Sequence, residues 1–358
     1  MTNSTWIADD KIIHLLNNFL QNDYHDNEPG AGILILVDDR VIYERCFGLS
    51  NLDTYEKITP ETNFRLASLT KQFTAYGIIL LEQENKLSRT DTIGQFFSVN
   101  FQNEYPLISN KITIQHLLDH SSGLYDYEDN NFDIHNQWSD YDVLEYLHDK
   151  TYFEPGTKYR YSNTGYILLG LIIENISTKS LGDFFYEYIF QPFNMKTSIL
   201  YNSRQTFIKN RALGYKKKFH EQSYELSDQS STSATRGDGG IYMSLNDYLQ
   251  WYHHCPSLSL ISLFPIDKTS KTTYYYHLGW FLNDSTSQIR IHSGDSCGFT
   301  HQVFRIDNEQ RKILVLYLTN IGNNNEKIQK FNHFIIENIP QLNPNNTNLL
   351  WDMVKLTR

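Results

Sequence analysis

Segments that favour β-strands occur near both ends of the chain, and a long helical middle separates them. Residues 31–37 and 41–47 are rich in β-branched and aliphatic side chains and are joined by the polar connection 38–40, which predicts a hairpin. Three more strands are expected near the other end, at 288–292, 300–306 and 312–318. Strands at both ends with helices between them predict one discontinuous architecture, in which the two ends form a single antiparallel sheet.

Helices are expected to flank this sheet and to fill the middle of the chain. Apolar residues at helical spacing predict an amphipathic helix over 8–22, and a closing helix is expected near 324–339. Four polar residues precede apolar periodic segments and are candidate N-caps: Ser139, Asn163, Ser180 and Ser244. The fold class is therefore α+β, an α/β sandwich with an inserted, mostly helical domain. Within one catalytic unit, we expect 1–70 and 236–358 to form the sheet domain and 71–235 the helical domain, with the active site in the seam.

The composition is that of a globular protein with no affinity for nucleic acid. With 358 residues, 40% of them apolar, the chain can bury a substantial core, and its formal net charge of −10 opposes contact with phosphates. Cys46, Cys255 and Cys297 lie far apart and cannot all pair, which suits a reducing compartment. Neither a leader nor an apolar run long enough to span a bilayer is visible. We expect a cytoplasmic protein without a membrane span, or a periplasmic one if a leader has been removed.

The segment Ser68-Leu69-Thr70-Lys71 places a hydroxyl and an amine three residues apart. If a helix begins at Ser68, the two side chains are neighbours on one face, and the amine lies within reach of the Ser68 Oγ. A lysine can take the proton of an attacking serine if desolvation and neighbouring cations lower its pKa. Backbone N–H groups at the helix start would face the developing negative charge. The pair predicts acyl transfer, although a single Ser-x-x-Lys is more often a solvated helix turn.

Two further motifs follow in the chain, Tyr161-Ser162-Asn163 and His292-Ser293-Gly294. The three motifs in this order resemble those of the serine β-lactamase and penicillin-binding-protein superfamily, most closely the branch of class C β-lactamases, D-Ala-D-Ala carboxypeptidases and esterases. Other segments also resemble that family, namely 112–124, 153–157, 239–242 and 278–280. The likeness spans roughly residues 30 to 320. It implies a β-lactamase/transpeptidase-like fold and chemistry through an acyl-enzyme.

Tyr161 and Asn163 are assigned roles beside the serine and the lysine. The Tyr161 phenol would act as partner base or proton shuttle and would protonate the leaving group. The alternative is a core tyrosine, because the chain contains 25 of them. Asn163 caps the helix that follows or holds Lys71 and the substrate amide, and these roles do not exclude each other.

His292 stands where the β-lactamases of this family have a lysine. A histidine titrates near neutrality, so we expect a hydrogen bond and only a fractional charge at pH 7, which weakens carboxylate recognition. This difference favours an esterase, amidase or peptidase over an efficient penicillinase. Arg290, two residues earlier on the same strand face, would restore positive charge or lie on the surface. The resemblance also implies that the N–H of Asp295, just after Gly294, is an oxyanion donor, and its carboxylate would repel anionic substrates.

Other polar clusters carry weaker signals. His116 and His120 have a spacing that can bind zinc on a helix face, but no zincin glutamate lies between them, and we predict no metal site. The cluster 253–255 is similarly weak. Residues 274–276, all tyrosines, either line the cleft or form a strand edge. Residues 221–235 are either an exposed loop that overhangs the cleft or a disordered connector.

Together the motifs predict a cofactor-free serine hydrolase. Ser68 would attack an ester or amide carbonyl of a small molecule or peptide, Lys71 and Tyr161 would move the protons, and water would release the acyl group. One alternative is a penicillin-binding or peptide-binding sensor that is acylated but barely deacylated, and another is a true class C-like β-lactamase. The motifs leave the oligomeric state open.

Overall fold

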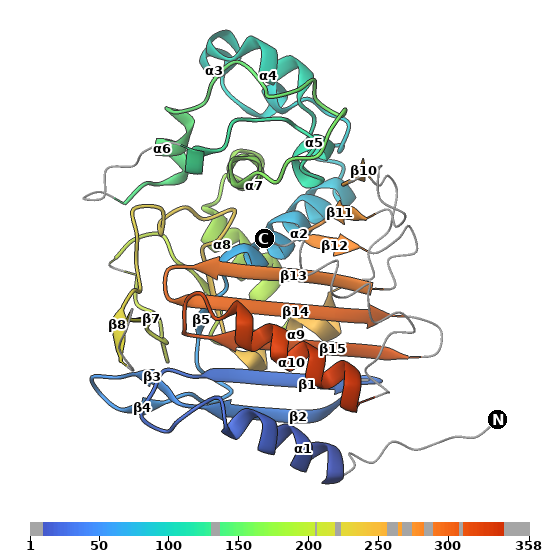
Figure 1. Cartoon of the computed structure of the whole chain (residues 1–358). Helices are drawn as coiled ribbons and strands as arrows, with labels where there is room; N and C mark the ends of the chain where they lie inside the picture. Colours follow the sequence, from blue (N-terminus) through green and yellow to red (C-terminus); the bar gives the residue numbers. More distant parts are fainter. Residues whose placement is uncertain are drawn as a thin grey trace, which may run out of the picture.

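An antiparallel sheet forms the centre of the computed structural model (Figure 1). The structure describes residues 10–129, 137–204, 206–218, 223–255, 264–266, 274–282, 289–307 and 311–339. Within these ranges the sheet has eight strands. The strands, in their order across the sheet, are β10 (Phe264–Pro265), β11 (Tyr275–His277), β12 (Trp280–Leu282), β13 (Ile289–Ser296), β14 (Phe299–Asp307), β15 (Lys312–Thr319), β1 (Ala31–Val37) and β2 (Arg40–Phe47). The N-terminal hairpin joins the C-terminal strands through β1 and β15, where Ala31 lies opposite Thr319. The prediction of one sheet built from both ends of the chain is confirmed.

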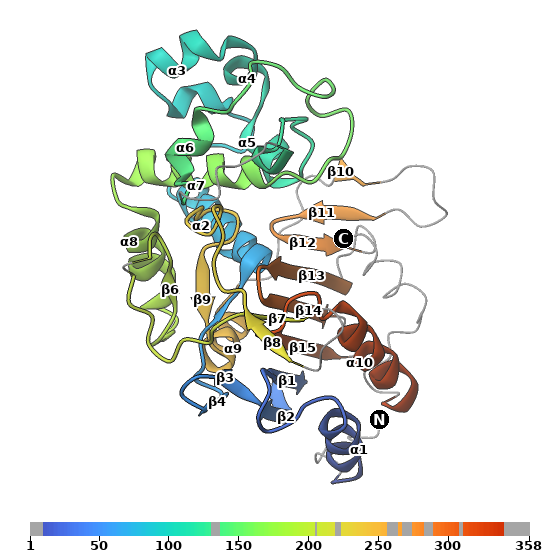
Figure 2. The ribbon, with the colours of Figure 1, turned by 60° about the vertical axis from the view of Figure 1, so that its left-hand side comes forward.

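Helices cover both faces of this sheet. On one face lie α1 (Asp10–Gln21) and α10 (Asn325–Asn338), and the ring of Phe331 in α10 is centred 5.2 Å from that of Tyr317 in β15. On the other face lies α9 (Leu245–His254), as Figure 2 shows. It packs so closely that a Cβ at Gly32 of β1 would stand 2.9 Å from Leu245. Every residue of β1 is buried, which explains why its sequence is continuously apolar instead of alternating.

The middle of the chain is mostly helical and packs beside one edge of the sheet (Figure 1). Its helices are α2 (Lys71–Gln83), α3 (Val99–Glu104), α4 (Pro106–Lys111), α5 (Ile114–Leu118), α6 (Asp140–Leu144), α7 (Asn163–Ser177) and α8 (Leu181–Phe185), with single turns η1 (Ala67–Thr70), η2 (Ile93–Phe96), η3 (Tyr127–Asp129) and η4 (Tyr186–Phe190). Short strands form three small sheets: β3 (Leu49–Asn51) with β4 (Glu56–Lys57); β5 (Phe64–Arg65), β9 (Ile241–Met243) and β6 (Ile199–Leu200); β7 (Tyr215–Lys217) with β8 (Tyr224–Leu226). Helix α7 is buried on all sides over residues 164–174, so it forms the core of the helical part.

Three of the four predicted N-caps are confirmed, because the hydroxyl groups of Ser139, Ser180 and Ser244 each accept the N–H three residues later. The prediction that Asn163 is an N-cap is wrong. The N-cap of α7 is Ser162, whose Oγ accepts the Gly165 N–H at 3.1 Å. Asn163 is the first helical residue, its N–H donates to Asp126 at 2.6 Å, and its side-chain oxygen accepts from Lys71. The shorter serine side chain therefore caps the helix and leaves the asparagine side chain available to the site.

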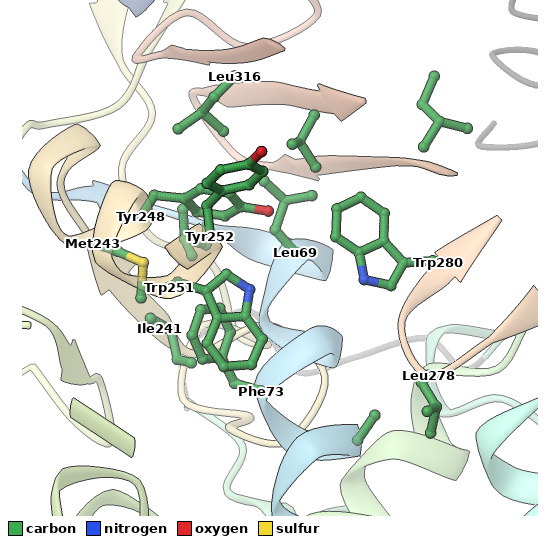
Figure 3. Packing of buried hydrophobic residues seen from close by; sticks show 14 of the residues in the cluster. Leu69, Phe73, Ile241, Met243, Tyr248, Trp251, Tyr252, Leu278, Trp280 and Leu316 are labelled. Carbon is green, nitrogen blue, oxygen red and sulfur yellow. The ribbon is translucent and has the colours of Figure 1, made fainter. Parts of the chain in front are cut away.

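An apolar cluster fixes the start of α2 (Figure 3). The ring of Phe73 is centred 4.2 Å from that of Trp251 in α9, and both residues are buried. The buried Gln72, which directly precedes Phe73, accepts hydrogen bonds from the Tyr248 hydroxyl at 2.9 Å and from the Trp251 indole at 3.3 Å. Burial of one such aromatic side chain contributes about 1.5–3 kcal/mol. The turn that carries the serine motif is therefore held in place by tightly packed buried side chains.

Two observations bear on the expectations from composition. Among the helices of the described ranges, none has the length and apolar character required to cross a membrane. The three cysteines, Cys46, Cys255 and Cys297, are each free and half-buried.

Candidate active site

Ser68 and Lys71 lie together at the junction of η1 and α2. The Lys71 Nζ donates to the Ser68 Oγ at 3.0 Å, and the lysine is fully buried. Its other hydrogen bonds go to the Asn163 Oδ1 at 2.7 Å and to the backbone oxygen of Asp238 at 2.9 Å. Ser68 is half-buried and lines a cavity of about 280 Å³. The predicted nucleophile thus faces open space, and its predicted base lies behind it with an acceptor for each of its three N–H groups.

The backbone around the nucleophile is tightly constrained. Ala67 has a φ of +48°, in the left-handed region that is unfavourable for a residue with a Cβ. Strand β13 passes against this turn, and a Cβ at Gly294 would stand only 2.3 Å from the Leu66 backbone oxygen. Only glycine permits that approach. As a result Asp295, the next residue on β13, lines the same cavity as Ser68.

Tyr161 completes the predicted catalytic group. Its half-buried ring is centred 5.0 Å from the Lys71 Nζ, and the residue lines the cavity. Burial raises the pKa of Tyr161, although the Lys71 charge and hydrogen bonds with the side chains of Ser68 and Lys71 oppose this shift. The phenol therefore keeps its proton in the resting state and stands close to the serine as a potential proton donor.

His120 and His116 both make contacts with other groups of the protein. The His120 ring packs against that of Tyr161 at a tilt of 38°, with 4.2 Å between centroids, and its Nδ1 accepts the Ser162 N–H at 3.1 Å. Burial lowers the pKa of His120 well below its usual range. His116 closes the first turn of α5 through a reciprocal hydrogen-bonded pair with Thr113. Within the described ranges, no group of three or more His, Cys, Asp and Glu residues is placed to hold a metal ion.

His292 does not behave as the sequence led us to expect. It is buried on β13, and its Nδ1 lies 2.6 Å from the Ser293 carbonyl oxygen, which can only accept, so Nδ1 carries the proton. Nε2 then accepts from the Tyr276 hydroxyl at 2.9 Å. Burial lowers the pKa of His292 to about 3, with help from the Lys71 charge. The expectation of a fractional charge at pH 7 is therefore wrong. The ring lines the cavity, and both of its nitrogens are hydrogen-bonded within the protein.

This arrangement makes a prediction about pH. Because burial lowers the pKa of His292, the folded protein should keep this ring neutral from about pH 8 to about pH 5, whereas the unfolded chain should protonate it near pH 6.5. The contribution of His292 to stability is therefore full above about pH 6.5 and is lost as the pH falls toward 3. NMR of the ring protons, assigned by their absence in His292→Gln, should show a constant chemical shift over that range. A titration midpoint between about 6 and 7 in the folded protein would contradict the buried, neutral ring.

Arg290 and the tyrosines at 274–276 take positions that the sequence left open. Arg290 is buried and forms an ion pair of 3.0 Å with Asp307 of β14, so it neither lines the cavity nor lies on the surface. Its charge is committed to that carboxylate. Tyr276 is fully buried on β11 and orients His292 from behind. Tyr276 therefore does not line the cavity.

The cavity wall also contains residues that the motifs did not single out: Arg65, Tyr127, Glu128, Thr232, Thr235 and Asp238. The two threonines come from the segment 221–235, of which residues 221 and 222 lie outside the described part of the chain. Glu128 is partly exposed, but its position in the cavity wall removes its carboxyl from part of the solvent and raises its pKa to about 7, and the nearby charges of Asp126 and Asp238 add to this effect. The only signal in the sequence was that Asp238 immediately precedes Gly239-Gly240, a pair that we had matched to the family.

Comparisons with known proteins show the family of this chain. A family model described as Beta-lactamase matches residues 16–337. Penicillin-binding protein 4* of Bacillus subtilis (strain 168) is 32% identical over 304 residues, which cover 78% of this chain and 65% of that relative, so the chain spans slightly less than two thirds of its length. The octameric penicillin-binding protein homologue from Pyrococcus abyssi superposes with a TM-score of 0.66 at 25% identity, over 88% of this chain and 73% of that chain. The D-amino acid amidase from Ochrobactrum anthropi SV3 shares the fold, with a TM-score of 0.70 at 20% identity over 91% and 99% of the two chains. This chain therefore belongs to the Beta-lactamase family, in the superfamily of serine β-lactamases and penicillin-binding proteins.

Proposed function

We propose that this protein is a serine hydrolase that cleaves ester or amide bonds through a covalent acyl-enzyme. The observation that carries the proposal is the 3.0 Å contact between the Ser68 Oγ and the Lys71 Nζ, at the wall of a cavity that Tyr161 also lines. Membership of the Beta-lactamase family supports the same chemistry. The proposed steps use only side chains and water.

In the acylation step, the Ser68 Oγ attacks the carbonyl carbon while the Lys71 amine, in its neutral form, accepts the hydroxyl proton. The new C–O bond places negative charge on the carbonyl oxygen, which the N–H groups of Ser68 and Asp295 would stabilise by about 3 to 4 kcal/mol each. The bond to the leaving group then breaks, and Tyr161 supplies the proton that the departing amine or alkoxide needs. In the second step, water attacks the acyl carbon and gives a proton to the Tyr161 phenolate, and Lys71 returns its proton to the Ser68 Oγ as the acyl–oxygen bond breaks. This step releases an acid and restores all three side chains.

The cavity favours small molecules or peptide ends over nucleic acids. Three acidic residues line it within the described part of the chain, namely Glu128, Asp238 and Asp295, and they oppose the approach of phosphates. The neutral His292 offers no cation at the position where a lysine would hold the carboxylate of a penicillin. Both features support an esterase, amidase or peptidase over an efficient β-lactamase.

A second candidate is a penicillin-binding or peptide-binding protein that is acylated but barely deacylated. The similarity to Penicillin-binding protein 4* favours it. The two candidates differ only in the fate of the acyl-enzyme.

A time course distinguishes these candidates. The protein is mixed with a chromogenic ester and, separately, with a chromogenic cephalosporin, and a serine-directed phosphonate is used to label the nucleophile. A hydrolase releases product continuously from the ester and incorporates one phosphonate on the peptide that contains Ser68. A stoichiometric burst without further release supports the binding protein, and sustained cephalosporin cleavage supports a β-lactamase. Labelling of a different residue would refute both.

A further inference from the structure

We propose that the acyl group of the substrate carries a protonated amine next to the scissile carbonyl, as in amino-acid esters, amino-acid amides and peptides with a free N-terminus. In this proposal, which rests on the proposed function, the carboxylates of Asp238 and Glu128 bind the ammonium group. Both residues line the cavity that contains Ser68. The substrate class is thereby narrowed from esters and amides in general to cationic acyl donors.

Asp238 has a binding capacity that the protein itself does not use. The residue is 5% exposed, and its Oδ2 accepts the Tyr127 hydroxyl at 2.8 Å. Its Oδ1 is buried without a hydrogen-bond partner in the described part of the chain. Buried carboxylate oxygens are almost always hydrogen-bonded, so an exception in a cavity wall indicates that a ligand supplies the donor. An ammonium group, with three N–H donors and a positive charge, satisfies both the hydrogen bond and the charge.

The cations nearest to these carboxylates are committed elsewhere. The three N–H groups of Lys71 are directed to Ser68, to Asn163 and to the main-chain oxygen of Asp238, and not to its carboxylate. The Arg236 side chain, two residues earlier in the sequence, is bound by Asp140 and Glu174 in the helical part. The repulsion between the two carboxylates is consistent with the raised pKa of Glu128, about 7 after the larger effect of burial. A bound cation would relieve that repulsion.

Other charged groups on the same cavity do not change this assignment. Asp126 is nearby, but its carboxylate accepts the N–H groups of Glu128, Asn163 and Thr164, so it holds the start of α7. Arg65 also lines the cavity, and its guanidinium faces the rings of Tyr201 and Tyr242 at 5.7 and 6.0 Å. Its Nε and Nη1 are buried without a hydrogen-bond partner in the described part of the chain, so this cation offers donors to an acceptor elsewhere on the same ligand. Asp295 is exposed and adds a third negative charge. Acidic groups thus outnumber basic ones around the space that the acyl group would occupy.

The position of Asp238 determines which amine is recognised. The backbone oxygen of Asp238 and the Ser68 Oγ both contact the same Lys71 Nζ, at 2.9 and 3.0 Å. The backbone of residue 238 is therefore a neighbour of the attacking oxygen, and its side chain lines the same cavity. This placement favours an ammonium group near the carbonyl carbon, as in an α-amino acid.

The test compares three acyl groups on one leaving group: phenylalanine p-nitroanilide, 3-phenylpropionyl p-nitroanilide, which lacks the amine, and N-succinyl-phenylalanine p-nitroanilide, which is anionic. Both enantiomers of the amino acid are assayed. We expect kcat/KM for the ammonium substrate to exceed that for the neutral one by at least about 10-fold, equivalent to about 1.4 kcal/mol. In Asp238→Asn this ratio should fall to near one, and in Glu128→Gln, whose residue is exposed, it should fall less. Asp53→Asn makes the same chemical change at an exposed site outside the cavity and should keep the wild-type ratio.

The outcomes separate this inference from the proposed function. If the neutral substrate is turned over and Ser68 is labelled, but the ammonium substrate has no advantage, only the inference fails. A ratio that Asp238→Asn and Glu128→Gln both leave intact overturns it too, as does preference for the succinyl substrate, which would implicate Arg65. If no substrate is turned over and the phosphonate labels another residue, the proposed function itself fails. Should Asp238→Asn not fold, Glu128→Gln alone decides, because its side chain reaches the surface.

Discussion

Replacing Ser68 by alanine is expected to lower kcat on a chromogenic ester by about 10⁴-fold or more, because no other group in the described cavity wall is placed to attack the carbonyl with a base 3.0 Å away. The small remaining rate would come from the oxyanion-binding N–H groups alone. Steady-state release of the chromophore measures the loss, and mass spectrometry should show that phosphonate labelling disappears with it.

The matched control is Ser88→Ala, which removes the same hydroxyl from an exposed position outside the cavity. It should retain wild-type turnover and labelling. Because Ser68 is half-buried and its hydroxyl contacts Lys71, Ser68→Ala should change the free energy of unfolding by only about 1 kcal/mol. Turnover that survives in folded Ser68→Ala would end the assignment of the nucleophile.

Replacing Lys71 by methionine is expected to lower kcat by about 10³-fold, since a base that takes the serine proton typically contributes 10² to 10⁴. Methionine has a similar length and keeps the buried volume filled, but it leaves the Asn163 Oδ1 and the Asp238 backbone oxygen without their donor. A loss of about 1–3 kcal/mol in the free energy of unfolding should accompany the lost activity. Lys57→Met, on the exposed strand β4, is the control and should affect neither quantity.

A second substitution separates the base from its charge. Arginine keeps the positive charge at position 71 but does not give up its proton in proteins, so Lys71→Arg should be about as inactive as Lys71→Met. If the arginine variant folds and retains most of the activity, Lys71 acts only as a cation, and the proton must be taken by another group such as Tyr161.

The positions of the central strands and the proximity of Ser68 to Lys71 were predictable because each rests on a local pattern. Continuous apolar segments identified the central strands, and β1 has the predicted bounds of 31–37. Spacing of three residues placed Ser68 beside Lys71, since one helical turn is a local geometry. The motif at 292–294 lies within β13, although we expected that strand to end at 292. The strand continues because its pairing with β14 extends to Ser296, and the sequence of one strand does not show where its neighbour ends.

The features that were not predictable depend on contacts between distant segments. The neutral state of His292 follows from burial and from Tyr276 and Ser293, and a histidine in a sequence gives no sign of either burial or tautomer. Glu128 in η3 and Asp238 in the turn before β9 line the same cavity, although these two segments are remote in the chain. Asn163 lost its expected capping role to its neighbour Ser162, because only the tertiary structure shows that the asparagine side chain is taken by Lys71.

The pairing of β1 with β15 has a consequence for biosynthesis. While the nascent chain leaves the ribosome, the β1–β2 hairpin has one edge without a partner, because Ala31 must wait for Thr319 before that edge is closed. Pairing between segments so remote in sequence makes folding slow, and an open apolar strand edge is prone to aggregation during the delay. The protein should therefore complete the sheet beside its candidate site only after β15 has been synthesised, and chaperones that shield strand edges should raise its yield.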